Sequence, residues 1–245
     1  MDTSLLIAVT LTVFLSTMIR STFGFGDALV AMPLLTMFLG LKSATPLVAL
    51  LASTIAFVIL IRRWREVDMA GAWRLMLSTA FGIPLGLLLL KSGWEVPMKM
   101  LLAAVIIGFV LHQWLRPQFR QVSGKAAWIF GFIAGILGGA YNTNGPPVVV
   151  FGTLRCWDPA RFRATLQGYF FPTGLLILAS HGMGGLWTRE IYHLYLLCLP
   201  VVLTAVLAGG YLHARIPSAR FMHAVYGFLM LLGLSLFIQT LGFFD

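Results

Sequence analysis

The sequence contains few charged residues. Asp, Glu, Lys and Arg make up 10% of its 245 residues, and hydrophobic residues make up 59%, whereas a soluble globular domain carries roughly a quarter charged residues. Apolar runs of about 18 or more residues recur along the chain, and each is long enough to cross a hydrocarbon layer of ~30 Å as a helix. The composition therefore excludes a soluble domain and predicts an all-α membrane protein.

The sequence also lacks the patterns of several functional classes. Cys156 and Cys198 have no motif spacing, and none of the five histidines has metal-ligand spacing, so we expect free thiols, no metal and no cofactor. No nucleophile and base pattern or phosphate loop is present, which argues against an enzyme. The net charge of +9 is scattered in short clusters between apolar runs, which argues against a nucleic-acid partner.

Two apolar stretches are interrupted in a similar way. The chain reads STFGFGDALVAMPLL directly after Arg20 and GILGGAYNTNGPPVVV around residue 140. Residues 23–27 match residues 141–145 at a displacement of 118 positions, which indicates an internal repeat. The most polar linker, 116–125, lies between the two stretches. We therefore expect two membrane repeats, 1–117 and 118–245, that form one transport domain.

Plain apolar runs predict six long helices in addition to the two interrupted pieces, 5–40 and 126–154. If each interrupted piece crosses the membrane once, both faces receive eight basic residues. If each piece enters and returns, or crosses twice, one face receives twelve and the other four, a clear excess of the kind that marks the cytoplasmic side. The long helices are expected at 43–62, 70–91, 96–115, 159–181, 188–212 and 218–241.

The second arrangement places both termini outside and makes the two repeats inverted. The two breaks then reach equivalent depths from opposite faces, where one central site can form. Non-helical backbone inside a bilayer is tolerated only within protein or beside a watery cavity. A helix that restarts after a break presents unpaired N–H groups and the positive end of its dipole, which suit an anion. Candidate substrate-binding residues at the breaks are Thr22, Gly24, Gly26, Asn142, Thr143, Asn144 and Gly145.

Arg20 is the most informative charge, because a guanidinium deep in hydrocarbon costs at least ~2.5 kcal/mol and needs a cavity or a partner. It either holds the anion with its planar fork, pairs with Asp27, or reaches an interface. Asp27 is the one acid inside an apolar segment; it either carries a coupling proton or caps a helix that begins at Ala28. Asn144 is the corresponding cap, with Pro146 in the first turn.

Other polar residues and glycines leave two interpretations open. Asn142 and Thr143 either donate hydrogen bonds to a ligand or satisfy local backbone groups. Arg163 and Gln167 are four residues apart and share one helix face, although Arg163 also fits a basic residue near a cytoplasmic loop. The glycine stripes fit helix packing better than ligand binding; they are Gly82 with Gly86, and Gly131 with Gly135 and Gly139.

The runs GFGDALVAMPLL, GGAYNTNGPPVVV and ARFRATLQGYFF closely resemble the TauE/SafE sulfite exporter family, also called the toluene sulfonate uptake permease family, over essentially the whole chain. The resemblance implies a bacterial inner-membrane transporter of sulfite, sulfoacetate or other sulfonates. This chain differs from the family at Asp27, where the family often has a small residue, and at 142–144, where the family is richer in glycine. The family's motif positions correspond to Gly24, Gly26, Pro33, Gly139, Gly145, Pro146 and Arg163.

The sequence thus predicts a polytopic helical bundle of two inverted repeats. The expected function is that of a secondary exporter or permease for small sulfur-containing anions, working by alternating access and coupled to protons or to the membrane potential. An anion channel built on the same broken helices is the alternative. The expected partners are the anion and the lipid bilayer, and a homodimer is the candidate assembly.

Overall fold

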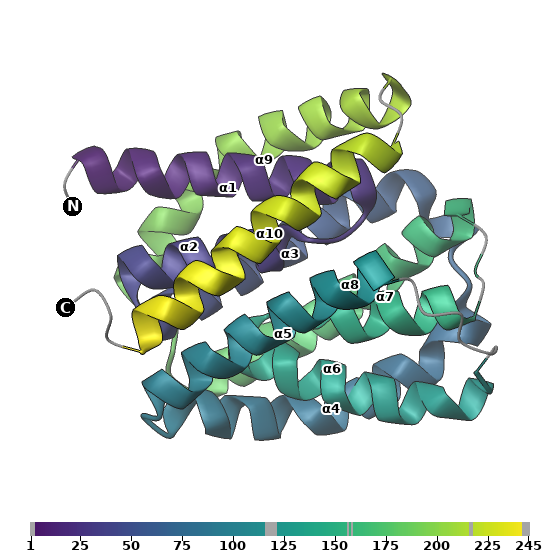
Figure 1. The fold of residues 1–245 in the computed structure, drawn as a ribbon, viewed down its shortest axis with the longest axis horizontal. Helices are drawn as coiled ribbons and strands as arrows, with labels where there is room; N and C mark the ends of the chain where they lie inside the picture. The colour runs from purple at the N-terminus through teal and green to yellow at the C-terminus, as the bar shows by residue number, and fades with distance from the viewer. Residues whose placement is uncertain (1–2, 116–121, 156, 158, 216–217, 242–245) are drawn as a thin grey trace.

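The computed structural model describes residues 3–115, 122–155, 157, 159–215 and 218–241. All regular structure in these ranges is helical (Figure 1), which confirms the predicted fold class. The first half contains α1 (Thr3–Phe23), α2 (Asp27–Leu39), α3 (Leu41–Arg63), the 3₁₀ turn η1 (Trp64–Glu66), α4 (Met69–Lys91) and α5 (Glu95–Leu115). The second contains η2 (Gly124–Ala126), α6 (Ala127–Tyr141), α7 (Gly145–Leu154), α8 (Pro159–Met183), α9 (Arg189–Arg215) and α10 (Ser218–Thr240).

Both predicted helix interruptions are present. Residues 24–26 separate α1 from α2, and residues 142–144 separate α6 from α7, so both breaks lie 118 positions apart. Both breaks contain left-handed backbone, with φ of 90° at Gly24, 100° at Gly26 and 52° at Asn142. Glycine adopts this conformation without a steric penalty, and asparagine tolerates it better than most residues. The six long helices also lie within a few residues of their predicted ranges.

Five helical segments of the described chain are long and apolar enough to cross a membrane. By contrast, α7 has 10 residues and reaches only about 15 Å, half the hydrocarbon thickness. This length favours a helix that returns within the membrane over one that crosses it. The spanning segments are Thr3–Phe23, Leu41–Ile61, Met69–Lys91, Gly124–Tyr141 and Arg189–Leu212.

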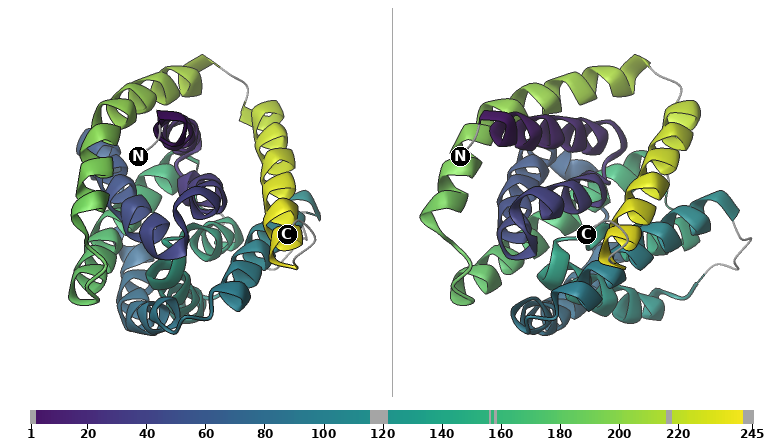
Figure 2. Two further views of the ribbon diagram at one scale, coloured as in Figure 1. Left: turned by 90° about the vertical axis from the view of Figure 1, so that its left-hand side faces the viewer. Right: turned by 60° about the vertical axis from the view of Figure 1, so that its left-hand side comes forward.

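Most close helix pairs join the two halves of the chain. The most extensive packing is between α4 and α6, and the other main pairs are α1 with α9, α5 with α10 and α3 with α8. Figure 2 shows α1 and α2 in the interior, between α9 and α10. The linker 116–121, where the repeats were predicted to divide, lies outside the described residues.

Glycines allow the close contact between α4 and α6. A Cβ on Gly82 would lie 2.9 Å from Cα of Gly135, and a Cβ on Gly139 would collide with the carbonyl oxygen of Ile83. Small residues let helix backbones approach in this way inside a membrane. Thr79 adds a hydrogen bond of 2.8 Å from its hydroxyl to a carbonyl oxygen on α6. The predicted packing role of the glycine stripes is confirmed.

Candidate functional site

One pocket brings the two helix breaks together at the centre of the structure. We call it the central pocket, and its empty space, together with adjoining open space, is about 410 Å³. The first break and α2 form one side, the second break and α7 form another, and α1, α3 and α8 complete the wall. Its lining residues are Arg20, Gly26, Asp27, Ala28, Leu29, Ala52, Ser53, Asn142, Thr143, Asn144, Gly145, Pro146, Phe170 and Gly174.

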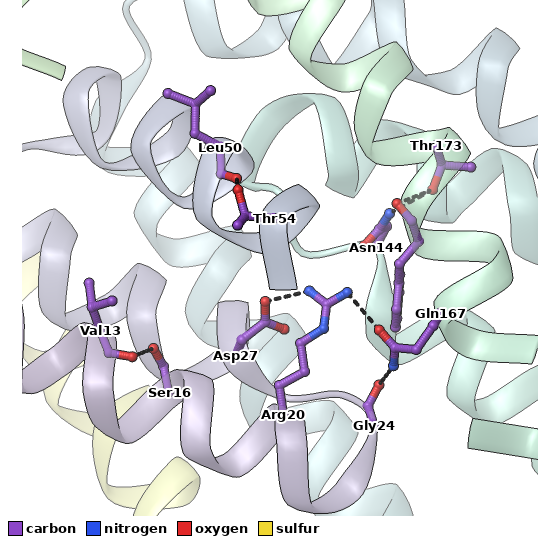
Figure 3. Close-up of polar contacts among 11 residues, drawn as sticks. Val13, Ser16, Arg20, Gly24, Asp27, Leu50, Thr54, Asn144, Gln167 and Thr173 are labelled. Carbon is purple, nitrogen blue, oxygen red and sulfur yellow. Dashed lines mark hydrogen bonds and ion pairs between the residues drawn. The ribbon is translucent and has the colours of Figure 1, made fainter. Parts of the chain in front are cut away.

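Arg20 lies in the last turn of α1 with only 2% of its surface exposed. Its Nη1 donates to Oδ2 of Asp27 at 2.6 Å, and its Nη2 donates to Oε1 of Gln167 at 3.1 Å (Figure 3). The guanidinium carbon lies 4.8 Å from the ring centroid of Phe170. The third donor, Nε, is buried and has no hydrogen-bond partner among the described residues. Arg20 therefore pairs with Asp27 and does not extend to an interface.

Asp27 does not cap the helix that follows the first break. Helix α2 begins at Asp27 itself, one residue earlier than predicted, and its N-cap is Gly26. The cap prediction is wrong because the carboxylate accepts a hydrogen bond from Arg20, which is a charged donor and a stronger partner than a neutral amide. No side chain caps α2, and its first residues, 27–29, line the central pocket.

The second break leaves the start of α7 uncapped as well. Asn144 occupies the N-cap position and Pro146 lies in the first turn, as predicted. The side chain of Asn144 does not cap the helix, and its amide nitrogen lies 3.5 Å from the hydroxyl of Thr173 on α8. The hydroxyl of Thr143 donates to the carbonyl oxygen of Tyr141 at 3.0 Å. Two short helices thus point their N-terminal ends at one pocket.

Gln167 and Arg163 share one face of α8, and neither lines the central pocket. Gln167 bridges the break, since its Nε2 donates to the carbonyl oxygen of Gly24 at 2.6 Å. Arg163 donates to the carbonyl oxygen of Ser21 at 2.9 Å and does not line the central pocket. A second pocket of about 270 Å³ is lined by Gly24, Ile59, Leu60, Arg163, Ala164 and Gln167.

Thr22 was predicted to be a site residue, but the structure places it between α1 and α9. Its hydroxyl bonds to the carbonyl oxygens of Met18 at 2.8 Å and of Gly209 on α9 at 3.2 Å. It lines neither pocket. Cys198 is a buried free thiol, as predicted, and Cys156 lies outside the described residues.

Phe170 and Ser53 are two of the pocket residues that were missed in the sequence. Phe170 follows Gln167 by three positions, so the helical period alone could have placed it on the same face. Ser53 lies in the middle of α3, and its buried Oγ has no hydrogen-bond partner among the described residues. No local signal distinguishes Ser53 from a serine that packs between helices.

Two broken helices that meet around a buried guanidinium in a many-helix membrane protein are typical of membrane transporters. Residues 9–236 match the family described as "Sulfite exporter TauE/SafE". The chain belongs to this family, so it is a multi-pass membrane transporter and not an enzyme.

Among curated proteins, the chain is 25% identical over 179 residues to a Cupriavidus necator protein named "Probable sulfite/organosulfonate exporter TauE". The alignment covers 69% of this chain and 70% of that relative. No solved structure matches the chain.

Proposed function

We propose that the protein is a secondary transporter of sulfite, sulfoacetate or other organosulfonates in the bacterial inner membrane, with the central pocket as its substrate site. The observation that carries this proposal is the meeting of both helix breaks around Arg20, whose Nε is buried and unpartnered. The name of the Cupriavidus relative supports the same substrate class.

The groups around the pocket suit an oxyanion. Arg20 supplies positive charge and a free N–H, and the uncapped starts of α2 and α7 supply backbone amides at the positive ends of two helix dipoles. Gly26 and Gly145 lack side chains, so a ligand can approach the backbone closely. Asn142 and Asn144 add neutral polar groups at the pocket wall. A sulfonate or sulfite presents several oxygens to such a set of donors.

Alternating access follows from two inverted repeats, 1–117 and 118–245. Under that relation α1 to α5 correspond to α6 to α10. Exchange of the two repeats then turns the pair α1 with α9 into the pair α6 with α4. The same exchange leaves the pair α3 with α8 and the pair α5 with α10 unchanged. The observed packing follows this scheme, and the 118-residue displacement of both breaks agrees with it. Movement of one repeat against the other would expose the central pocket to each face in turn.

Gln167 forms the barrier between the central and second pockets in this state. It contacts Arg20 on one side and the carbonyl oxygen of Gly24 on the other. We assign the second pocket to the cytoplasmic side, because Arg163 belongs to the face predicted to carry twelve basic residues. A cytoplasmic anion would meet Arg163 first and reach Arg20 after Gln167 moves.

The test is transport by purified protein in vesicles, with labelled sulfite, sulfonates and carboxylates. Saturable flux with countertransport is expected, whereas large single-channel currents would identify a channel instead. Arg20→Lys keeps the charge beside Asp27 but loses Nε and the fork geometry. Loss of charge-assisted hydrogen bonds worth about 1.5–3 kcal/mol should raise KM roughly tenfold to a hundredfold.

Arg65→Lys is the matched control, because Arg65 is exposed and stacks on Trp64 at 5.2 Å, away from both pockets. It should transport as the wild type does. Normal kinetics in Arg20→Lys would remove Arg20 from the substrate site.

A further inference from the structure

The central pocket holds one positive and one negative side chain, and they neutralise each other. Arg20 and Asp27 are the charged residues among those that line it. Their ion pair is short and buried, with Nη1 and Oδ2 separated by 2.6 Å and side-chain exposures of 3% and 10%. The pocket without substrate therefore has a net charge of zero.

The described surroundings of Asp27 offer no second acid. Helix α1 presents Arg20 to the carboxylate, and α8 presents the neutral Gln167, with Arg163 in the separate second pocket. Helix α3 presents Ser53 to the same pocket. Helices α5 and α10 also pack against α2. The ring of Phe109 on α5 contacts Phe25, and the ring of Tyr226 on α10 contacts Phe109. The titratable residues of α5 with described side chains, Lys99 and His112, do not line the pocket.

This charge balance restricts what can bind. A monoanion added to this neutral pair of side chains would bring an excess buried negative charge, which the partial charges at the starts of α2 and α7 offset only in part. Such an excess is unfavourable in a medium of low dielectric constant. A proton from water that binds to a carboxylate oxygen of Asp27 removes this charge. It also releases Nη1 of Arg20, which with the unpartnered Nε gives the anion two donors. Proton and anion therefore favour each other's binding.

A hydroxyl from α3 adds a neutral donor to the pocket. Ser53 is 6% exposed, its Oγ has no partner among the described residues, and the side chain lines the central pocket from α3. It can donate to one oxygen of a ligand while Arg20 donates to another. The site thus offers neutral and cationic donors and a single exchangeable proton.

We propose that the central pocket binds one monoanion together with one proton on Asp27, and carries both in the same direction without net charge movement. This proposal rests on the transport function proposed above and narrows its substrate class. The proton comes from water on the side where the anion binds, and it returns to water on the side where the anion leaves. Methanesulfonate and hydrogensulfite are suitable substrates. Sulfate is a poor one, because this dianion would leave a net negative charge even when Asp27 is protonated.

The test uses the full-length protein in vesicles that contain a pH-sensitive dye, with labelled methanesulfonate as the monoanion and sulfate as the dianion. Wild-type protein should move about one proton with each methanesulfonate, and an imposed potential should not change the final accumulation. Asp27→Asn should still move methanesulfonate, now without protons. An inside-positive potential of about 60 mV should then concentrate it about tenfold, as expected for one moving charge.

Three further variants separate the proton site from other effects. Ser53→Ala should raise the methanesulfonate concentration needed for half-maximal flux and leave the proton-to-anion ratio unchanged. Ser16→Ala is its control, because Ser16 is buried on α1 and bonds within its own helix at 3.1 Å (Figure 3). Asp68→Asn controls for loss of an acid, since Asp68 caps α4 outside the pocket and asparagine is an equally good cap.

Methanesulfonate flux without proton flux in the wild type would overturn this proposal and leave the transport function intact. Sulfate flux as fast as methanesulfonate flux would do the same. Failure of the wild-type protein to move methanesulfonate, sulfite or any other sulfonate would contradict the proposed function as well.

Discussion

Gln167 and Gly24 connect the two halves of the protein at the first helix break. The side-chain amide of Gln167 donates to the carbonyl oxygen of Gly24 at 2.6 Å, although the residues are 143 positions apart. Gln167 is 1% exposed and also accepts a hydrogen bond from Arg20. One neutral side chain thus holds the broken backbone and the buried cation in place.

Gln167→Leu keeps a similar side-chain volume but removes both hydrogen bonds. The carbonyl oxygen of Gly24 then lies buried without this partner, at a cost of about 1–3 kcal/mol. We expect the barrier between the pockets to open more often. A water-soluble thiol reagent should modify a cysteine placed at Ser53 about tenfold faster, as a change of 1.4 kcal/mol implies. The native cysteines are replaced by alanine for this measurement.

Gln113→Leu on α5 provides the matched control, because Gln113 lines neither pocket. It should leave the rate of thiol modification unchanged. Equal rates in Gln167→Leu and its parent would contradict the barrier.

Gly82→Ala should destabilise the protein. The added Cβ would lie 2.9 Å from Cα of Gly135 and would also collide with the carbonyl oxygen of Phe132, so α4 and α6 must separate. Overpacking of this kind costs typically about 1–3 kcal/mol, which a lower melting temperature in detergent would reveal. In the control Gly108→Ala, the Cβ meets no atom within 4 Å, and alanine favours the helix by up to about 1 kcal/mol. Equal melting temperatures of the two variants would contradict the packing role of Gly82.

Thr22→Val separates a sequence-based expectation from the structure. Valine retains the shape but loses the hydrogen bond to Gly209, which should lower stability by about 1 kcal/mol without changing KM for the anion. Asn144→Leu, at the wall of the central pocket, should instead raise KM. A comparable rise of KM in both variants would return Thr22 to the substrate site.

The sequence predicted the helices and the positions of both breaks, because these depend on local chemistry. Gly24, Gly26 and Asn142 can adopt left-handed backbone where other residues resist it. The role of Asp27 could not be predicted in the same way, because capping and ion pairing were both chemically available. The carboxylate of Asp27 pairs with Arg20, because the break between α1 and α2 brings these two residues together. Ser53 and Phe170 were missed because nothing in a single helix shows that they face a shared pocket.

The sequence by itself determined that the chain is a bundle of apolar helices with two matched interruptions, and that one arginine and one acid lie within apolar segments. Its hydrophobicity and backbone preferences act over a few residues, so they can be read without knowledge of the fold. Only the tertiary structure decided which polar groups meet. It placed Thr22 against α9 and Arg163 in the second pocket, and it placed Arg20, Asp27 and Ser53 around one cavity. These outcomes depend on contacts between distant segments, and the packing of helices selects them.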